Sequence, residues 1–143
     1  MNLISVYTRE QAIEDGVLMR LDEFISNQQE GMTLNERMRF SEAMGEIRQN
    51  RIAKVALGEL VITAAATGKL DASTAIKCLM RHEAGDWGEL CEEDWEANEN
   101  ALKDGSRLFS VYEVDRENEN NALFYVITEW NREATTILLS EDY

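Results

Sequence analysis

The chain has 143 residues, enough for one compact domain, and its hydrophobic fraction of 44% is typical of a globular protein rather than a disordered one. Its 28 acidic and 14 basic side chains give a formal net charge of −14, which opposes direct binding to nucleic acid or to an anionic membrane, because both select basic surfaces. The two cysteines have neither a CxxC spacing nor a histidine cluster nearby, so we expect no disulfide framework, no metal site and no cofactor.

The charge is unevenly distributed along the chain. Residues 1–82 hold 11 acidic and 10 basic side chains, a net charge of −1, whereas residues 83–143 hold 17 acidic and 4 basic side chains, a net charge of −13. No signal peptide is apparent, and no apolar run reaches the roughly 18 residues that would cross a bilayer. We therefore expect a cytoplasmic protein whose negative field belongs to its carboxyl-terminal part.

The amino-terminal residues predict a short strand, a short helix and a second strand. Leu3–Tyr7 is apolar enough for the first strand. Thr8 followed by Gln11 is a capping-box pair that predicts a helix, and Gly16 is suited to end it. Val17–Leu21 then has the composition of a strand.

The next part of the chain is expected to be mainly helical. Asn27–Gly31 is interpreted as a polar loop, after which the capping-box pair Thr33 and Glu36 predicts a long helix. The run 52–66 is apolar on nearly every side, which favours a central buried helix. Asp71 is placed to cap a further helix over 72–81.

The last part of the chain changes from helical to strand-like periodicity. Glu83–Gly105 is predicted to be an acidic helix opened by Asp86. Arg107–Val114, Leu123–Trp130 and Thr135–Leu139 are rich in strand-forming residues and predict a three-stranded antiparallel meander.

These elements predict one α+β domain over residues 1–143. A mainly helical part, 1–82, is expected to pack with the acidic helix and the meander of 83–143. The chain contains no proline, no repeat and no low-complexity linker that would divide it.

A helical wheel places five glutamates of the predicted acidic helix within one arc of roughly 120°. Eight acidic and no basic residues lie between Glu83 and Glu99, about one charge per 3 Å of helix, close to the ~3.4 Å per phosphate of a nucleic-acid strand. Either the face imitates nucleic acid, or it is a solvated surface that keeps the protein soluble. The candidate partner-binding residues are Glu83, Asp86, Glu89, Glu92, Glu93, Glu96 and Glu99.

Asp94 and Asn98 fall in the apolar arc of the same wheel, so we expect both to be buried and partnered. Such partners would form a structural network or, alternatively, a small polar site. The candidate members of this network are His82, Asp94, Asn98, Arg107, Arg132, Thr135 and Thr136.

His82, the only histidine, has two interpretations. It could serve as a general base or acid beside Asp94 and Arg132, or it could stabilise the end of a helix. No phosphate loop, nucleophile elbow or metal cluster is present, and we assign no catalytic residue.

Several of these residues form a pattern that resembles an uncharacterised family of small acidic proteins found on plasmids, phages and integrated mobile elements. The pattern comprises His82–Gly88, then Asp94 and Asn98, then Ile127–Glu129 and 132–143. The segment Val6–Leu18 is similar to a second motif from proteins of the same kind of element. The resemblance implies a setting rather than a mechanism.

Three functional hypotheses remain from the sequence. The leading one is a non-enzymatic protein that binds the basic surface of a nucleic-acid-binding host protein and inhibits it, as a DNA mimic directed against restriction or CRISPR complexes would. The second is a small nuclease or toxin-like enzyme with a cleft formed by His82, Asp94, Arg107 and Arg132. The third is a structural or regulatory module that forms a homodimer through Trp87, Trp95 or Trp130.

Overall fold

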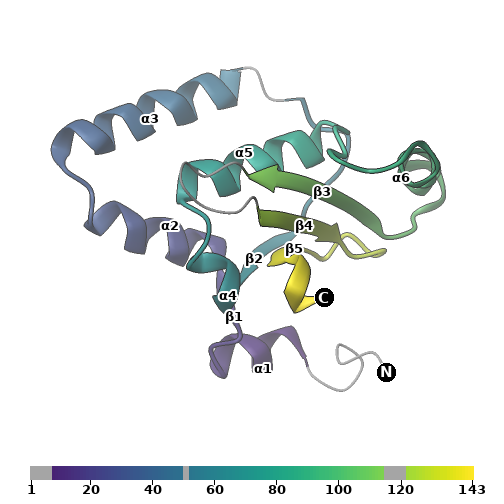
Figure 1. Cartoon of the computed structure of the whole chain (residues 1–143), viewed down its shortest axis with the longest axis horizontal. Helices are drawn as coiled ribbons and strands as arrows, with labels where there is room; N and C mark the ends of the chain where they lie inside the picture. Colours follow the sequence, from purple (N-terminus) through teal and green to yellow (C-terminus); the bar gives the residue numbers. More distant parts are fainter. Residues whose placement is uncertain (1–7, 50–51, 115–121) are drawn as a thin grey trace.

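The computed structural model describes residues 8–49, 52–114 and 122–143. A five-stranded mixed sheet organises the molecule, in the order β1-β2-β5-β4-β3 (Figure 1). Strand β5 pairs parallel with β2, and the other neighbours pair antiparallel. The strands are β1 (Leu18–Arg20), β2 (Glu59–Thr63), β3 (Leu108–Val114), β4 (Ala122–Thr128) and β5 (Ala134–Leu139).

The helices are distributed around this sheet. One face is covered by α2 and α5, α6 lies beyond the edge strand β3, and α3 stands away from the sheet (Figure 1). A short 3₁₀ helix, η2, follows β5. The bounds are α1 (Arg9–Glu14), α2 (Leu21–Glu30), α3 (Leu34–Gln49), α4 (Ala64–Thr67), α5 (Ala72–Glu83), α6 (Glu92–Asp104) and η2 (Ser140–Asp142).

The core lies between α2 and α5 and the covered face of the sheet. Leu79 of α5 packs there with Phe24 of α2 and with Phe124, Val126 and Ile137 of the central strands. A smaller cluster of Trp87, Ala101 and Leu108 joins α6 to the sheet. Burial of these apolar surfaces holds the helices to the sheet. The predicted α+β class is confirmed.

Three of the local capping signals, at Thr8, Thr33 and Asp71, are confirmed. Thr8 and Gln11 form a reciprocal capping box at the start of α1. Thr33 Oγ1 accepts the backbone N–H of Glu36 at the start of α3, and Asp71 accepts that of Thr74 in α5. Each of these hydrogen bonds joins two residues three positions apart, so no distant part of the sequence is needed to form it.

Two interpretations of the first half are wrong. Asn27–Gly31 is not a loop, because α2 continues to Glu30. The run 52–66 is not a buried helix: it contains an irregular segment, then β2, then the single turn of α4. Gly58 explains part of this difference, since it has a φ of +67° and a Cβ there would overlap the backbone of Glu133. The predicted strand Leu3–Tyr7 lies outside the described residues.

The strands predicted near the carboxyl end form, but they do not make a sheet of their own. Strand β5 pairs on one side with β4 and on the other with β2, from the first half of the chain, so all three belong to the five-stranded sheet. Within the described residues, none of the helices combines the length and the apolar composition that a membrane crossing requires.

Candidate functional site

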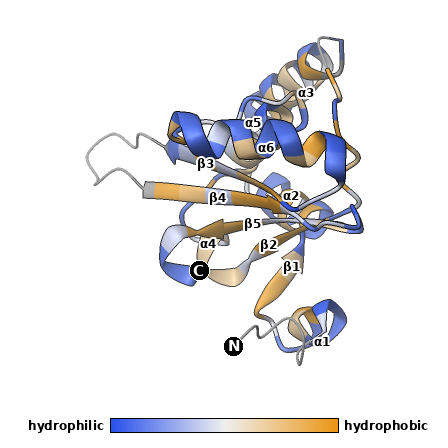
Figure 2. Cartoon of the chain, turned by 90° about the vertical axis from the view of Figure 1, so that its right-hand side faces the viewer, coloured by the Kyte–Doolittle hydropathy of each residue, from blue (hydrophilic) through white to orange (hydrophobic). Residues whose placement is uncertain are grey.

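Four exposed glutamates of α6 and of the segment that precedes it are here called the acidic face: Glu89, Glu92, Glu93 and Glu96. All four side chains are exposed, Glu89 in the segment that leads into the helix and the others within it. In Figure 2, α6 crosses in front of the sheet edge and most of its ribbon is hydrophilic. The helix dipole favours Glu92 and Glu93, because both lie in the first turn.

The acidic face has no counterion within the described part of the chain. The ion pairs seen there join Arg9 to Glu59 and Glu129, Arg20 to Glu59, and Arg81 to Asp86. None of them involves α6, which carries six acidic residues and the single lysine Lys103. These carboxylates therefore remain available to an external cation.

Two predicted members of the face lie elsewhere. Glu83 belongs to α5 and is 1% exposed, so a partner cannot reach it. Asp86 is bound by Arg81 at 2.8 Å and accepts the backbone N–H of Gly88, and these hydrogen bonds, that of Arg81 above all, lower its pKa. The prediction that Asp86 opens the acidic helix is wrong as well, because α6 starts at Glu92.

The segment before α6 is extended because it covers the outer edge of β3. Val111 donates its backbone N–H to the carbonyl of Trp87 and accepts that of Glu89, at 3.2 and 2.7 Å. Gly88 lies between them with a φ of +77°, and a Cβ there would overlap the Val111 carbonyl oxygen. Backbone pairing therefore outweighs the helical periodicity of residues 86–91.

Glu99 of α6, another member of the predicted face, is held by the core. It is half-buried, and its Oε1 accepts the indole N–H of the fully buried Trp87 at 3.0 Å. This carboxylate is oriented by the protein, whereas the other glutamates of α6 extend into water.

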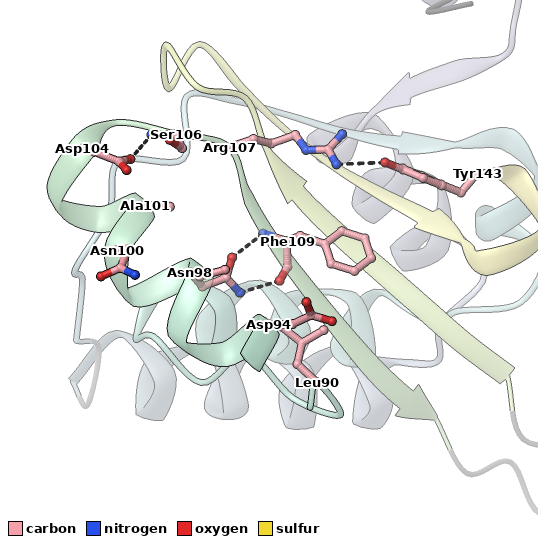
Figure 3. Close-up of a pocket in the computed structure, with 11 residues that line it drawn as sticks. Leu90, Asp94, Asn98, Asn100, Ala101, Asp104, Ser106, Arg107, Phe109 and Tyr143 are labelled. Atoms are coloured by element: carbon pink, nitrogen blue, oxygen red, sulfur yellow. Dashed lines mark hydrogen bonds between the residues drawn. The ribbon is translucent and has the colours of Figure 1, made fainter. Parts of the chain in front are cut away.

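Asn98 and Asp94 were predicted to be buried together, and only Asn98 is. Its amide donates to the carbonyl of Phe109 and accepts the Phe109 N–H, at 2.6 and 3.0 Å, so it pairs with edge strand β3 as a neighbouring strand would. Asp94 is exposed. It lines an open groove of about 650 Å³ between α6 and β3, which leaves it in contact with water (Figure 3).

The same groove contains one of the predicted arginines. Arg107 and Asp94 lie at opposite ends of it, and Arg107 donates to the Tyr143 hydroxyl at 2.9 Å (Figure 3). Arg132 instead donates to three backbone carbonyls, among them that of Ala101 near the end of α6. The cleft predicted from His82, Asp94, Arg107 and Arg132 is not assembled, because His82 is fully buried and Arg132 is committed to the backbone.

His82 belongs to a buried chain of hydrogen bonds. Its Nδ1 lies 2.5 Å from Ser110 Oγ and its Nε2 lies 2.8 Å from Thr128 Oγ1. Thr128 Oγ1 lies 2.8 Å from Thr135 Oγ1, which donates to the carbonyl of Leu57. All four polar residues are 0% exposed, so this hydrogen-bonded network is closed to the surrounding solvent.

The hydrogen bond from Thr135 to Leu57 determines which group is the donor in each of the other hydrogen bonds of the network. A carbonyl can only accept, so the Thr135 hydroxyl proton is used on Leu57, and Thr135 must accept from Thr128. Thr128 then accepts from His82 Nε2–H, and Nδ1 of the neutral ring accepts from Ser110. Burial, and secondarily the positive charge of Arg132, lowers the His82 pKa to about 4, which keeps this tautomer uncharged at neutral pH.

The observed network contains only some of the predicted residues, and it also contains residues that were not predicted. His82 and Thr135 belong to it, while Thr136 is half-buried on the opposite face of β5. Ser110 and Thr128 were missed. Their signal was in the sequence: both are polar residues at alternating strand positions otherwise occupied by buried apolar side chains such as Leu108 and Val126.

The network also connects distant parts of the sequence pattern, 82–88 with 127–129 and 132–143. His82 of α5 meets Thr128 of β4, 46 positions later, and the ring of Trp87 packs edge-on against His82 with centroids 5.4 Å apart. These residues form one buried structural unit. Their geometry gives them a role in stability, and it offers no path by which a substrate could reach the imidazole.

No group of three histidine, cysteine, aspartate or glutamate side chains within the described ranges is arranged to hold a metal ion. Comparisons with protein-family models, curated proteins and solved structures found no match to this chain.

Proposed function

We propose that this protein is a non-enzymatic cytoplasmic inhibitor of the kind carried by mobile genetic elements, and that its acidic face binds the basic surface of a nucleic-acid-binding host protein. One observation supports the proposal above all: Glu92, Glu93 and Glu96 are exposed on one helix without an ion-pair partner in the described residues. A defence complex that cuts or binds foreign DNA is the partner that fits both this surface and the family resemblance.

The physical basis is electrostatic imitation. Residues three and four positions apart on a helix have Cβ atoms roughly 5–6 Å from one another, so their carboxylates form a closely spaced row of negative charges, as phosphates do along a nucleic-acid strand. Like charges this close repel by about 0.2–0.5 kcal/mol per pair, and a cationic partner would relieve that repulsion. The net charge of −14 would also steer a basic protein toward the chain from a distance.

The test compares two variants with the same change in charge. The α6 charge variant combines Glu92→Gln, Glu93→Gln and Glu96→Gln. The control variant combines Glu14→Gln, Glu30→Gln and Glu42→Gln, which are exposed on α1, α2 and α3. Wild-type and variant proteins are immobilised, and nuclease-treated bacterial lysate is passed over each.

We expect wild-type and control proteins to retain a nucleic-acid-binding protein that a double-stranded DNA oligonucleotide displaces. Its affinity for the purified α6 charge variant should be at least about tenfold lower, a change of ~1.4 kcal/mol. Circular dichroism should show that both variants are folded. Equal affinity for the two variants, or a partner that DNA does not displace, would contradict the proposal.

A further inference from the structure

A groove on α6 places an aromatic ring among three carboxylates. It has a volume of about 470 Å³ and is lined by Leu90, Glu92, Trp95, Glu96 and Glu99. Trp95 is half-buried and packs, with Leu90, against the cluster around Trp87. Its ring is therefore held by the core while part of it remains accessible. The groove thus combines an apolar surface with a negatively charged rim.

The rim of this groove is partly fixed before any ligand arrives. Trp87, which is fully buried, donates its indole N–H to Glu99 Oε1 at 3.0 Å, so the core orients that carboxylate. Glu99 Oε2 takes no part in this hydrogen bond. Glu92 and Glu96 are exposed on the same helix, four residues apart, and can move toward a bound cation. One carboxylate held by the core and two exposed carboxylates therefore line the groove beside the ring.

A guanidinium group matches this arrangement better than an ammonium group does. It is planar, so it can stack on an indole face, and it carries five N–H donors that can reach carboxylates at its edges while the stacking is kept. Charge-assisted hydrogen bonds to carboxylates are about twice as strong as neutral ones. A lysine ammonium can satisfy the charges, but it has no plane to place against the ring.

We propose that the groove at Trp95 is a recognition site for one arginine side chain of the basic partner. This assignment rests on the proposed function, because it assumes that α6 meets a basic protein surface. The acidic face then supplies attraction, and the groove supplies the preference for arginine over lysine and the position at which the partner is held.

Octa-arginine and octa-lysine peptides are the probes. The ¹⁵N-labelled protein is titrated with each peptide at low salt, and the indole N–H signals of Trp95 and of the exposed Trp130 are followed. We expect octa-arginine to shift the Trp95 signal, to leave that of Trp130 unchanged, and to bind several-fold more tightly than octa-lysine. Trp95→Leu should weaken octa-arginine binding about tenfold and remove the preference, as expected for a lost cation–π contact.

The variants separate the groove from the acidic face. Trp130→Leu, the matched control, should bind both peptides as the wild type does. If Trp95→Leu is folded and keeps the wild-type affinity and preference, the groove assignment is wrong; weak binding by the α6 charge variant would then still support the proposed function. If the α6 charge variant also binds like the control variant, both proposals fail. Should Trp95→Leu not fold, an unshifted Trp95 signal in wild-type protein saturated with octa-arginine overturns the assignment.

Discussion

At the scale of single residues, the fold keeps its one histidine uncharged. The His82 ring donates to Thr128, accepts from Ser110 and packs against Trp87, all away from water. Burial raises the cost of protonating it, and the charge of Arg132 adds to that cost. A histidine in this environment acts as a neutral structural group.

This gives a prediction for pH dependence. The His82 pKa is lowered from 6.5 to about 4 in the folded state, so between these values the unfolded chain binds a proton that the folded chain does not. The contribution of His82 to stability is complete above pH 6.5 and is lost as the pH falls toward 4, by up to about 3 kcal/mol. Because it is the only histidine, its ¹³C-labelled ring signal needs no assignment, and an NMR titration measures this pKa directly. A midpoint near 6.5 in the folded protein would contradict the buried network.

At the scale of elements, α3 and α5 are held in different ways. The buried face of α5 includes Ala75, Cys78, Leu79 and His82. In α3 none of the described side chains is buried, and Leu34 and Met38 are exposed. The stability of α3 therefore depends mainly on the helix propensity of its own residues, whereas the stability of α5 depends mainly on its packing against the core.

Two glycines should respond in opposite directions to the same substitution. Gly45 lies inside α3, and a Cβ there meets no atom within 4 Å, so Gly45→Ala should stabilise the protein by up to about 1 kcal/mol through higher helix propensity. Gly88→Ala should destabilise it by more than that, because φ is +77° and the added carbon overlaps Val111. Urea unfolding followed by circular dichroism measures both changes. A neutral Gly88→Ala would show that the segment before α6 is not held against β3.

At the scale of the whole molecule, charge opposes folding and favours association. The net charge of −13 in residues 83–143 is carried by a part of the chain that must pack closely, so its self-repulsion destabilises the compact state. The same negative charge would attract a cationic partner. Added salt should therefore act on folding and on partner binding in opposite directions.

The corresponding prediction concerns thermal unfolding. Between about 0.01 M and about 0.1 M NaCl the Debye length falls from about 30 Å to about 10 Å, and the unfolding midpoint should rise by a few degrees. The α6 charge variant should show a smaller rise than the control variant, whose substitutions lie where acidic and basic residues nearly balance. A midpoint that falls with salt would mean that favourable ion pairs outweigh the repulsion.

The sequence by itself determined the features that depend on neighbouring residues. The capping pairs at Thr8 and Thr33, the cap at Asp71 and the end of α6 at Gly105 follow from interactions within a few residues, and each lies where it was predicted. The same holds for the concentration of negative charge in residues 83–143, because the order of the residues alone fixes it. The sequence is sufficient to predict these features, since the groups that interact are only a few residues apart.

Only the tertiary structure decided the features that depend on distant partners. Residues 60–62 are apolar enough for a buried helix or a buried strand, and they form a strand because β5, more than 70 positions later, supplies the parallel partner. Asn98 is buried because its amide pairs with the backbone of Phe109 in β3, whereas Asp94, one turn earlier on α6, stays exposed in the open groove. His82 finds Ser110 and Thr128 across 28 and 46 positions, a separation that no periodicity in the sequence encodes.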